Sequence, residues 1–268
     1  MVIAINGKIN SGKDTVGKII QYLDVLNQSN GSIPLGFSLD ILDSKVIENT
    51  GHTTWKVKRF ADKLKDIVCL LIGCTRDQLE DRNFKEKELG EEWWIYRVWS
   101  GGSMTGDFKE GIVSYLDTNK ELSNWEDSKL IKLTPRLLLQ LIGTECFRNI
   151  IHPNTWVNAL FSEYKQEENY QVGATPENLK WVDGEFPDWI ITDMRFPNEF
   201  KAVRDRNGIC IKIVRPITLH DNVIKVPKHE SETALDHITD WNYEIINDGS
   251  IEDLIEKVKI ILKLEDII

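Results

Sequence analysis

The sequence has few of the features that mark specialised protein classes. It contains 4 cysteines in 268 residues, and no two of them form a Cys-x-x-Cys pair. Cys69 lies within the apolar run at residues 67–72, as is typical of a buried free thiol, so we expect a reducing compartment and no structural zinc. This run is the longest apolar one, whereas a membrane-spanning helix needs about 20 residues. Met1 is followed by no basic leader or cleavage site, so we expect a cytoplasmic protein without a membrane partner.

Positive charge is scarce as well. The chain has 33 Lys and Arg against 43 Asp and Glu, a formal net charge of -10. This excess repels polyanions, so we expect no nucleic-acid polymer as a partner. A small anion is still compatible with it, because a few backbone amides and one lysine can build a local positive pocket. Apolar residues make up 41% and charged residues 28% of the chain, as in an ordinary globular protein.

The pattern of what is present predicts an α/β fold. Short β-branched runs alternate with longer helical patterns, which is typical of βαβ units and a mostly parallel sheet. The expected strands, five in all, lie at residues 2–6, 56–60, 189–192, 209–214 and 243–246. The expected helices lie at residues 12–26, 61–71, 135–148, 156–168, 198–206 and 251–263. We expect a single domain over residues 1–268.

Two segments, at about 27–55 and 73–133, do not fit simple βαβ spacing. Insertions of this kind on an α/β sheet commonly form lids or substrate-binding arms, and the alternative is a structural subdomain. The second insertion carries four cations, Arg76, Arg82, Lys85 and Lys87. They would either act in such a lid or simply form the solvent-exposed face of a helix. Its tryptophans at 93–99 are candidates for a homodimer interface.

Residues 7–15, with the sequence Gly-Lys-Ile-Asn-Ser-Gly-Lys-Asp-Thr, follow the first expected strand and open the first expected helix. This is the context that a phosphate-binding loop requires. Gly7 and Gly12 let the backbone curl so that successive amides point at a phosphate, while Lys13 reaches the outer phosphate oxygens. Asn10 and Ser11 lie in the same loop. The segment is the strongest functional signal in the chain and predicts nucleotide binding.

The residue after Lys13 departs from the usual pattern. Asp14 stands where Ser or Thr commonly holds magnesium, and Thr15 follows it. The Asp14 carboxylate could hold Mg²⁺ directly or through water, could meet the acceptor, or could simply favour the helix N-terminus. The Thr15 hydroxyl could also approach the metal or a phosphate. These roles stay open at this stage.

A second candidate group follows the strand expected at 189–192. Asp193 and Arg195 come directly after this strand, and the carboxyl ends of parallel strands line the ligand crevice. In P-loop enzymes such an acid orients magnesium, and such an arginine neutralises the transferring phosphoryl group. The alternative is a surface pair that ends the strand. Glu199 could hold Arg195 or a sugar hydroxyl, or serve as a helix N-terminal acid.

The helix expected at 135–148 carries polar side chains in steps of four, which places them on one face. These side chains are Arg136, Gln140, Thr144 and Arg148. Two arginines with an amide and a hydroxyl between them suit a phosphate and a base, although a solvated stripe is the alternative. Trp156 either stacks on a base or lies in the core.

Together these segments resemble the bacteriophage deoxynucleoside monophosphate kinases, P-loop kinases that move the γ-phosphate of ATP to a deoxynucleoside 5'-monophosphate. The resemblance extends from one end of the chain to the other. Its segments lie at residues 11–15, 60–65, 139–145, 156–157, 193–199 and 229–233. The last segment, with His229 to Glu232, matches no zinc pattern and would otherwise be interpreted as a loop. Leu137 departs from the pattern, where a second basic residue is expected.

The resemblance implies a P-loop kinase-type three-layer sandwich with ATP and Mg²⁺ at the phosphate loop, in the host cytoplasm. It implies that Lys13, Asp14 and Thr15 serve ATP and the metal, with Asp193 as a further metal ligand. The residues expected around the monophosphate are Lys65, Arg136, Gln140, Thr144, Arg148, Trp156, Asp193, Arg195 and Glu199. Catalysis itself is assigned to Lys13, Asp14, Arg136, Asp193 and Arg195.

Two other functions fit the phosphate loop. One is a kinase for another small phosphorylated acceptor, of the phosphomevalonate type, because that group shares the Gly-Lys-Asp-Thr loop. The other is a nucleotide-dependent regulatory switch whose hydrolysis is incidental. A kinase would form diphosphate only when an acceptor is present, whereas a switch would turn over slowly whether or not a monophosphate is added.

Overall fold

A computed structural model of the chain describes residues 1–29, 53–100, 112–117, 129–168, 170–172, 180–216 and 232–268. The contacts divide the chain into two compact units. The first unit consists of residues 1–62 and 153–268, and the second of residues 63–152.

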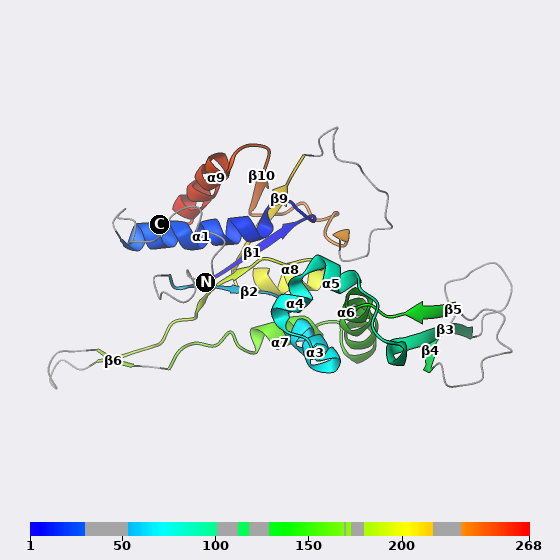
Figure 1. Cartoon of the computed structure of the whole chain (residues 1–268). Coiled ribbons are helices and arrows are strands. Elements are labelled where there is room, and N and C mark those ends of the chain that lie inside the picture. Colours follow the sequence, from blue (N-terminus) through cyan, green and yellow to red (C-terminus); the bar gives the residue numbers. More distant parts are fainter. Residues whose placement is uncertain (30–52, 101–111, 118–128, 169, 173–179, 217–231) are drawn as a thin grey trace. The chain divides into compact units, whose positions relative to one another are not determined.

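A five-stranded parallel sheet forms the centre of the first unit, with strand order β10-β9-β1-β8-β2 (Figure 1). Its strands are β1 (Val2–Gly7), β2 (Trp55–Lys58), β8 (Asp188–Ile191), β9 (Ile209–Val214) and β10 (Tyr243–Ile246). β1 lies between β8 and β9, with Ile3 opposite both Ile190 and Ile209. Both faces of these inner strands are apolar, because helices cover a parallel sheet on each side.

Helices form the two outer layers of this unit (Figure 1). α1 (Lys13–Gln28) packs beside α9 (Ile251–Leu264) on one face. Their main core contains alternate strand residues such as Ile3, Ile5 and Ile211. α7 (Thr155–Phe161) and α8 (Pro197–Arg204) pack together on the other face, where Phe161 stacks on Trp189. The result is a three-layer α/β sandwich.

A short antiparallel pair also belongs to the first unit. β6 (Tyr170–Val172) pairs with β7 (Lys180–Val182). The sequence pattern predicted neither strand, because three-residue strands carry too few alternations to be recognised. Instead it predicted a helix over 156–168, whereas α7 ends at Phe161.

The second unit combines short helices with a small antiparallel sheet. It contains α3 (Asp62–Ile72) except for its first residue, and then α4 (Arg76–Glu80), α5 (Arg82–Glu86) and the 3-10 turn η2 (Glu91–Trp93). The sheet has the order β4-β3-β5, built from β3 (Trp94–Ser100), β4 (Ile112–Asp117) and β5 (Lys129–Lys132). Its core includes Val68, Leu79, Leu133 and Leu138.

A π-helix ends the second unit. α6 (Pro135–Gln140) begins at the N-cap Thr134, whose side chain accepts a hydrogen bond from the backbone N–H of Leu137. It continues directly into the π-helix η3 (Leu141–Ile151). The sequence predicted one α-helix over 135–148. The bonding pattern changes from i→i+4 to i→i+5 after Gln140, so steps of four match the helix turn only as far as that residue.

The structure confirms the five expected strands of the parallel sheet and the helices that flank it. The insertion expected at 73–133 lies within the second unit, whereas most of the insertion at 27–55 lies outside the described residues. The four cysteines form no disulfide, and only Cys210 is buried: Cys69 and Cys74 are half-buried and Cys146 is exposed, so the expectation of a buried thiol is wrong for Cys69. No helix among the described residues is both long and apolar enough to cross a bilayer.

Candidate active site

The phosphate loop at residues 8–12 joins β1 to α1 through two residues with left-handed backbone conformation. Asn10 has φ of 62° and Gly12 has φ of 100°. The Ser11 N–H donates to the Lys8 carbonyl over 3.2 Å, which closes the turn. A chain that alternates between these conformations turns successive N–H groups inward and forms a concave site for an anion. The N-terminus of α1 faces the same place, and its dipole also favours negative charge.

Two side chains and one glycine shape the inside of this loop. The Lys13 ammonium donates to the Lys8 carbonyl over 2.8 Å. Burial lowers the pKa of Lys13, and the nearby charge of Arg195 lowers it further. The Ser11 hydroxyl is buried without a hydrogen-bond partner among the described residues. A Cβ on Gly7 would lie 2.4 Å from this hydroxyl and 2.8 Å from the Ile213 carbonyl oxygen, so only glycine leaves this space open.

Two further residues hold the loop from neighbouring strands. The Asn247 side chain, after β10, donates to the Ser11 carbonyl over 2.9 Å. The Arg215 guanidinium, after β9, donates to the Asn10 carbonyl over 3.4 Å. Neither residue was among those predicted from the sequence. Their position directly after expected strands was the available signal, since the carboxyl ends of parallel strands meet at one edge.

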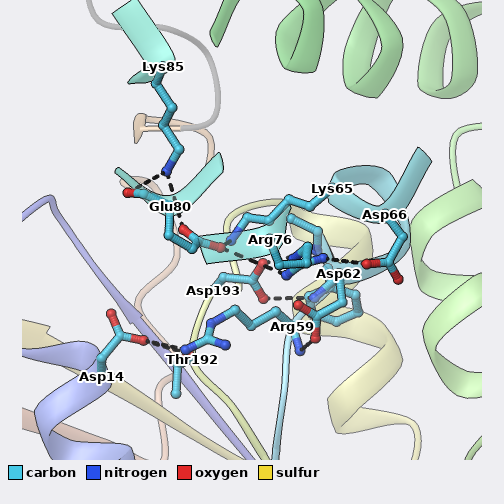
Figure 2. A network of polar contacts seen from close by, with 12 residues as sticks. Asp14, Arg59, Asp62, Lys65, Asp66, Arg76, Glu80, Lys85, Thr192 and Asp193 are labelled. Atoms are coloured by element: carbon cyan, nitrogen blue, oxygen red, sulfur yellow. Dashed lines mark hydrogen bonds and ion pairs between the residues drawn. The ribbon is translucent and has the colours of Figure 1, made fainter. Parts of the chain in front are cut away.

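Asp14 lies in the first turn of α1 and is held by two donors (Figure 2). Its Oδ1 atom accepts from the Arg59 guanidinium over 3.3 Å and from the Thr192 hydroxyl over 3.0 Å. Arg59 follows β2, and Thr192 follows β8. Burial alone would lower the pKa of Arg59, but the carboxylate of Asp14 outweighs it and raises that pKa. Arg59 was not among the predicted site residues, although it too follows an expected strand.

Asp193 connects the ends of two strands. Its carboxylate oxygens accept from the backbone N–H groups of Phe60 over 2.8 Å and Ala61 over 3.0 Å. Since charged hydrogen bonds of this kind are strong, Asp193 holds the turn that follows β2 against the end of β8. This places Asp193 at the carboxyl edge of the sheet, where the sequence predicted it.

Arg195 and Lys8 both line a polar pocket beside the phosphate loop. Its guanidinium donates to the Glu232 carboxylate over 2.6 Å. The Lys8 ammonium contacts the Glu232 carbonyl and the Asp236 carboxylate. The pocket is lined by Asn6, Gly7, Lys8, Arg195, Glu232, Leu235 and Asp236. Two cations and two carboxylates therefore line the pocket.

Glu199 and Trp156, two of the residues expected around the monophosphate, are both buried. Glu199 is 2% exposed, and its carboxylate accepts from the backbone N–H groups of Arg195 over 2.7 Å and Phe196 over 3.1 Å. It thus caps α8 and holds the backbone that carries Arg195. Trp156 is 4% exposed and belongs to the core.

Five of the residues expected around the monophosphate belong to the second unit. Arg136 forms an ion pair with Glu86 at 2.5 Å. Lys65 forms one with Glu80, also at 2.5 Å, and Glu80 contacts Lys85 as well (Figure 2). Gln140 ends α6, while Thr144 and Arg148 lie in the π-helix. The expected common face of all four polar side chains assumed one α-helix, and η3 does not have that geometry.

A parallel sheet whose first strand leads through such a loop into a helix defines the class of P-loop nucleotide-binding proteins. Residues 103–258 match the sequence model of the family described as deoxynucleotide monophosphate kinase. This match covers more than half of the chain, which therefore belongs to the deoxynucleotide monophosphate kinase family.

Named relatives agree with this assignment. The chain is 26% identical over 278 aligned residues to the deoxynucleotide monophosphate kinase of Escherichia phage RB69, covering 98% of this chain and 99% of that protein. It is 25% identical over 228 residues to the deoxynucleoside-5'-monophosphate kinase of Escherichia phage T5, covering 78% and 74%. The chain is thus a deoxynucleotide kinase with small-molecule substrates, and the phosphomevalonate-type and switch interpretations give way to this function.

Proposed function

We propose that this kinase transfers the γ-phosphate of ATP to a deoxynucleoside 5'-monophosphate with Mg²⁺ as cofactor. The observation that carries the proposal is the phosphate loop, in which the left-handed Asn10 and Gly12 flank Ser11 and its buried hydroxyl. ATP has the chain of phosphates that such a loop accommodates, and a family of monophosphate kinases needs a triphosphate donor.

The donor phosphates would be held by the loop amides, the Ser11 hydroxyl and Lys13. Lys13 already lies in the loop, where its ammonium rests on the Lys8 carbonyl. A phosphate is a stronger acceptor than this carbonyl, so the lysine would turn to the phosphate without leaving the loop. Gly7 and Gly12 keep the backbone close enough for this contact.

The residues of the first turn of α1 fit a magnesium site. Mg²⁺ usually binds one or two carboxylates together with substrate phosphates and water, rather than a cage made of protein alone. Asp14 offers a carboxylate that is 65% exposed, Thr15 follows with a hydroxyl, and Asp193 lies at the same sheet edge. When bound, the metal would neutralise charge on the outer phosphates.

The acceptor phosphate would be drawn in by arginines. Arg195 lines the pocket beside the loop, and its present partner Glu232 would yield it to a phosphate. Arg136, Gln140, Thr144, Arg148 and Lys65 are also proposed to bind the acceptor, with Arg136 as a catalytic cation. The transfer requires alignment and charge neutralisation rather than a covalent intermediate.

The segment at 73–133 is proposed to act as a lid that excludes water from the transfer. Within its described part, Arg76 and Lys85 are tied to the same carboxylate, Glu80. Because α4 and α5 are thereby joined, they would move together. We propose a cytoplasmic enzyme without nucleic-acid or membrane partners, and a homodimer as its assembly.

The test is a coupled assay of ADP formation with ATP, Mg²⁺ and each of dGMP, dTMP, dCMP, dAMP and GMP. We expect ADP only when an acceptor and the metal are present, with loss of the signal in EDTA and in Lys13→Ala. Lys201→Ala, an exposed lysine on α8, is the matched control and should keep full activity. Turnover that no monophosphate raises would refute the proposal.

A further inference from the structure

We infer that Arg59 and Thr192 are positioning residues that orient the Asp14 carboxylate toward the bound nucleotide. The inference rests on the proposed function, because it assumes that Asp14 serves ATP or its metal. Neither residue was suggested by the loop motif, and both lie at the ends of neighbouring strands, after β2 and β8.

The two donors act on the same oxygen atom. Arg59 and Thr192 donate to Asp14 Oδ1 over 3.3 and 3.0 Å (Figure 2). Among the residues that the structure describes, Oδ2 has no hydrogen-bond or ion-pair partner. A carboxylate held by one oxygen keeps a defined plane and leaves the other oxygen for a ligand. Arg59 and Thr192, which we call the Asp14 clamp, therefore keep Oδ2 pointing in a fixed direction.

Asp14 needs such a clamp because its side chain is 65% exposed. An exposed aspartate without partners would exchange between rotamers, and a ligand would have to restrict it again at an entropic cost. Thr192, in contrast, is 2% exposed and cannot move far. Its hydroxyl therefore keeps its position at the end of β8 and, through the hydrogen bond to Asp14, holds the first turn of α1.

The packing of α1 on β8 makes this contact short. A Cβ on Gly17 would lie 2.9 Å from the Thr192 methyl carbon and 3.4 Å from Ile190 Cγ2. The helix can approach the strand this closely because residue 17 has no side chain. Asp14 lies one turn earlier on the same helix, so the approach brings its carboxylate to the Thr192 hydroxyl.

Arg59 also balances the charge at this edge. The carboxylates that act on its guanidinium are those of Asp14, Asp193 and Asp62. Without Arg59 the same place would hold these like charges together and would repel a polyphosphate. The guanidinium thus both orients Asp14 and reduces this repulsion, whereas Thr192 only orients.

The test is a pair of double-mutant cycles on kcat and on the KM for ATP. Arg59→Met and Thr192→Val are each made in the natural chain and in Asp14→Asn. We expect each to lower kcat about tenfold when Asp14 is present and less than about twofold when it is absent, since residues acting through one another are not additive. Arg204→Met, whose guanidinium contacts Asn242, is the control and should change neither value.

A binding measurement separates positioning from folding. Calorimetric titration with ATP in Mg²⁺ and in EDTA should show that Thr192→Val loses much of the affinity that magnesium adds. Thr192→Ser keeps the hydroxyl and should restore it. Arg59→Lys should restore only part, because an ammonium lacks the planar fork of guanidinium. Thermal unfolding of each variant shows whether the fold is intact, and the two conservative variants test the inference if Arg59→Met or Thr192→Val does not fold.

The outcomes separate the inference from the proposed function. If Asp14→Asn keeps full activity, the proposed role of Asp14 fails. Suppose instead that Asp14→Asn is impaired. The positioning role is then refuted if Arg59→Met and Thr192→Val lower kcat by the same factor in the natural chain and in Asp14→Asn, or do not lower it at all. Equal losses for Arg59→Met in both backgrounds would instead indicate direct contact of Arg59 with a phosphate.

Discussion

Replacing Gly12 by alanine tests whether the phosphate loop depends on a residue without a side chain. Gly12 has φ of 100°, outside the small left-handed region that other residues reach. An alanine there costs about 1–2 kcal/mol in backbone energy. Its Cβ would also lie 2.7 Å from Asn247 Nδ2, which now donates to the Ser11 carbonyl. Displacing this amide costs about 1 kcal/mol for the lost hydrogen bond.

We therefore expect Gly12→Ala to lower the free energy of unfolding by about 2–3 kcal/mol, the sum of these two costs. Gly73→Ala is the matched control. Gly73 also has positive φ, 67°, but a Cβ there meets nothing within 4 Å. It should cost about 1–2 kcal/mol, from the backbone alone. The difference between the variants combines the contact with Asn247 and the greater backbone strain at φ of 100°, and an Asn247→Ala background separates the two.

Urea unfolding gives the stabilities, and calorimetric titration gives the affinity for ATP. Gly12→Ala should weaken ATP binding at least about tenfold, because the loop amides no longer converge. Gly73→Ala should bind ATP normally. In an Asn247→Ala background, the cost of Gly12→Ala should fall by about 1 kcal/mol. The reasoning is refuted if Gly12→Ala is as stable as Gly73→Ala and binds ATP as tightly as the natural chain.

Two further predictions concern pH. Burial would raise the pKa of Glu80, but its hydrogen bond with Lys65 and the charges of Lys65 and Lys85 lower that pKa overall. These contacts therefore stabilise the folded state at pH values above the ordinary glutamate pKa of 4.5. Glu80→Gln should have a lower free energy of unfolding than the natural chain at pH 7. This difference should disappear in acid, as Glu80 of the natural chain is protonated at its lowered pKa, and a difference that does not change with pH contradicts the prediction. Burial raises the pKa of Cys210 from 9.0 to about 12, so the natural chain should lose stability as pH rises between these values. Urea unfolding of Cys210→Ala should show a flatter alkaline dependence, whereas the exposed control Cys146→Ala should match the natural chain.

The sequence by itself determined the parallel sheet and the phosphate loop. The inner strands of the parallel sheet, β1, β8 and β9, are nearly continuous apolar runs, and such runs identify buried strands locally. The loop motif is also local, since Gly7, Gly12 and Lys13 lie within seven residues. Both features depend on short stretches of chain and on chemistry that a single segment expresses.

Only the tertiary structure decided what Arg59, Thr192, Asn247 and Glu199 do. Arg59 and Thr192 are 133 positions apart in the chain and meet at Asp14 because β2 and β8 are neighbours in the sheet. Glu199 could be a ligand or a cap in the sequence, and burial against two backbone amides made it a cap. Strand order and the close approach of α1 to β8 are long-range properties, which no local pattern specifies.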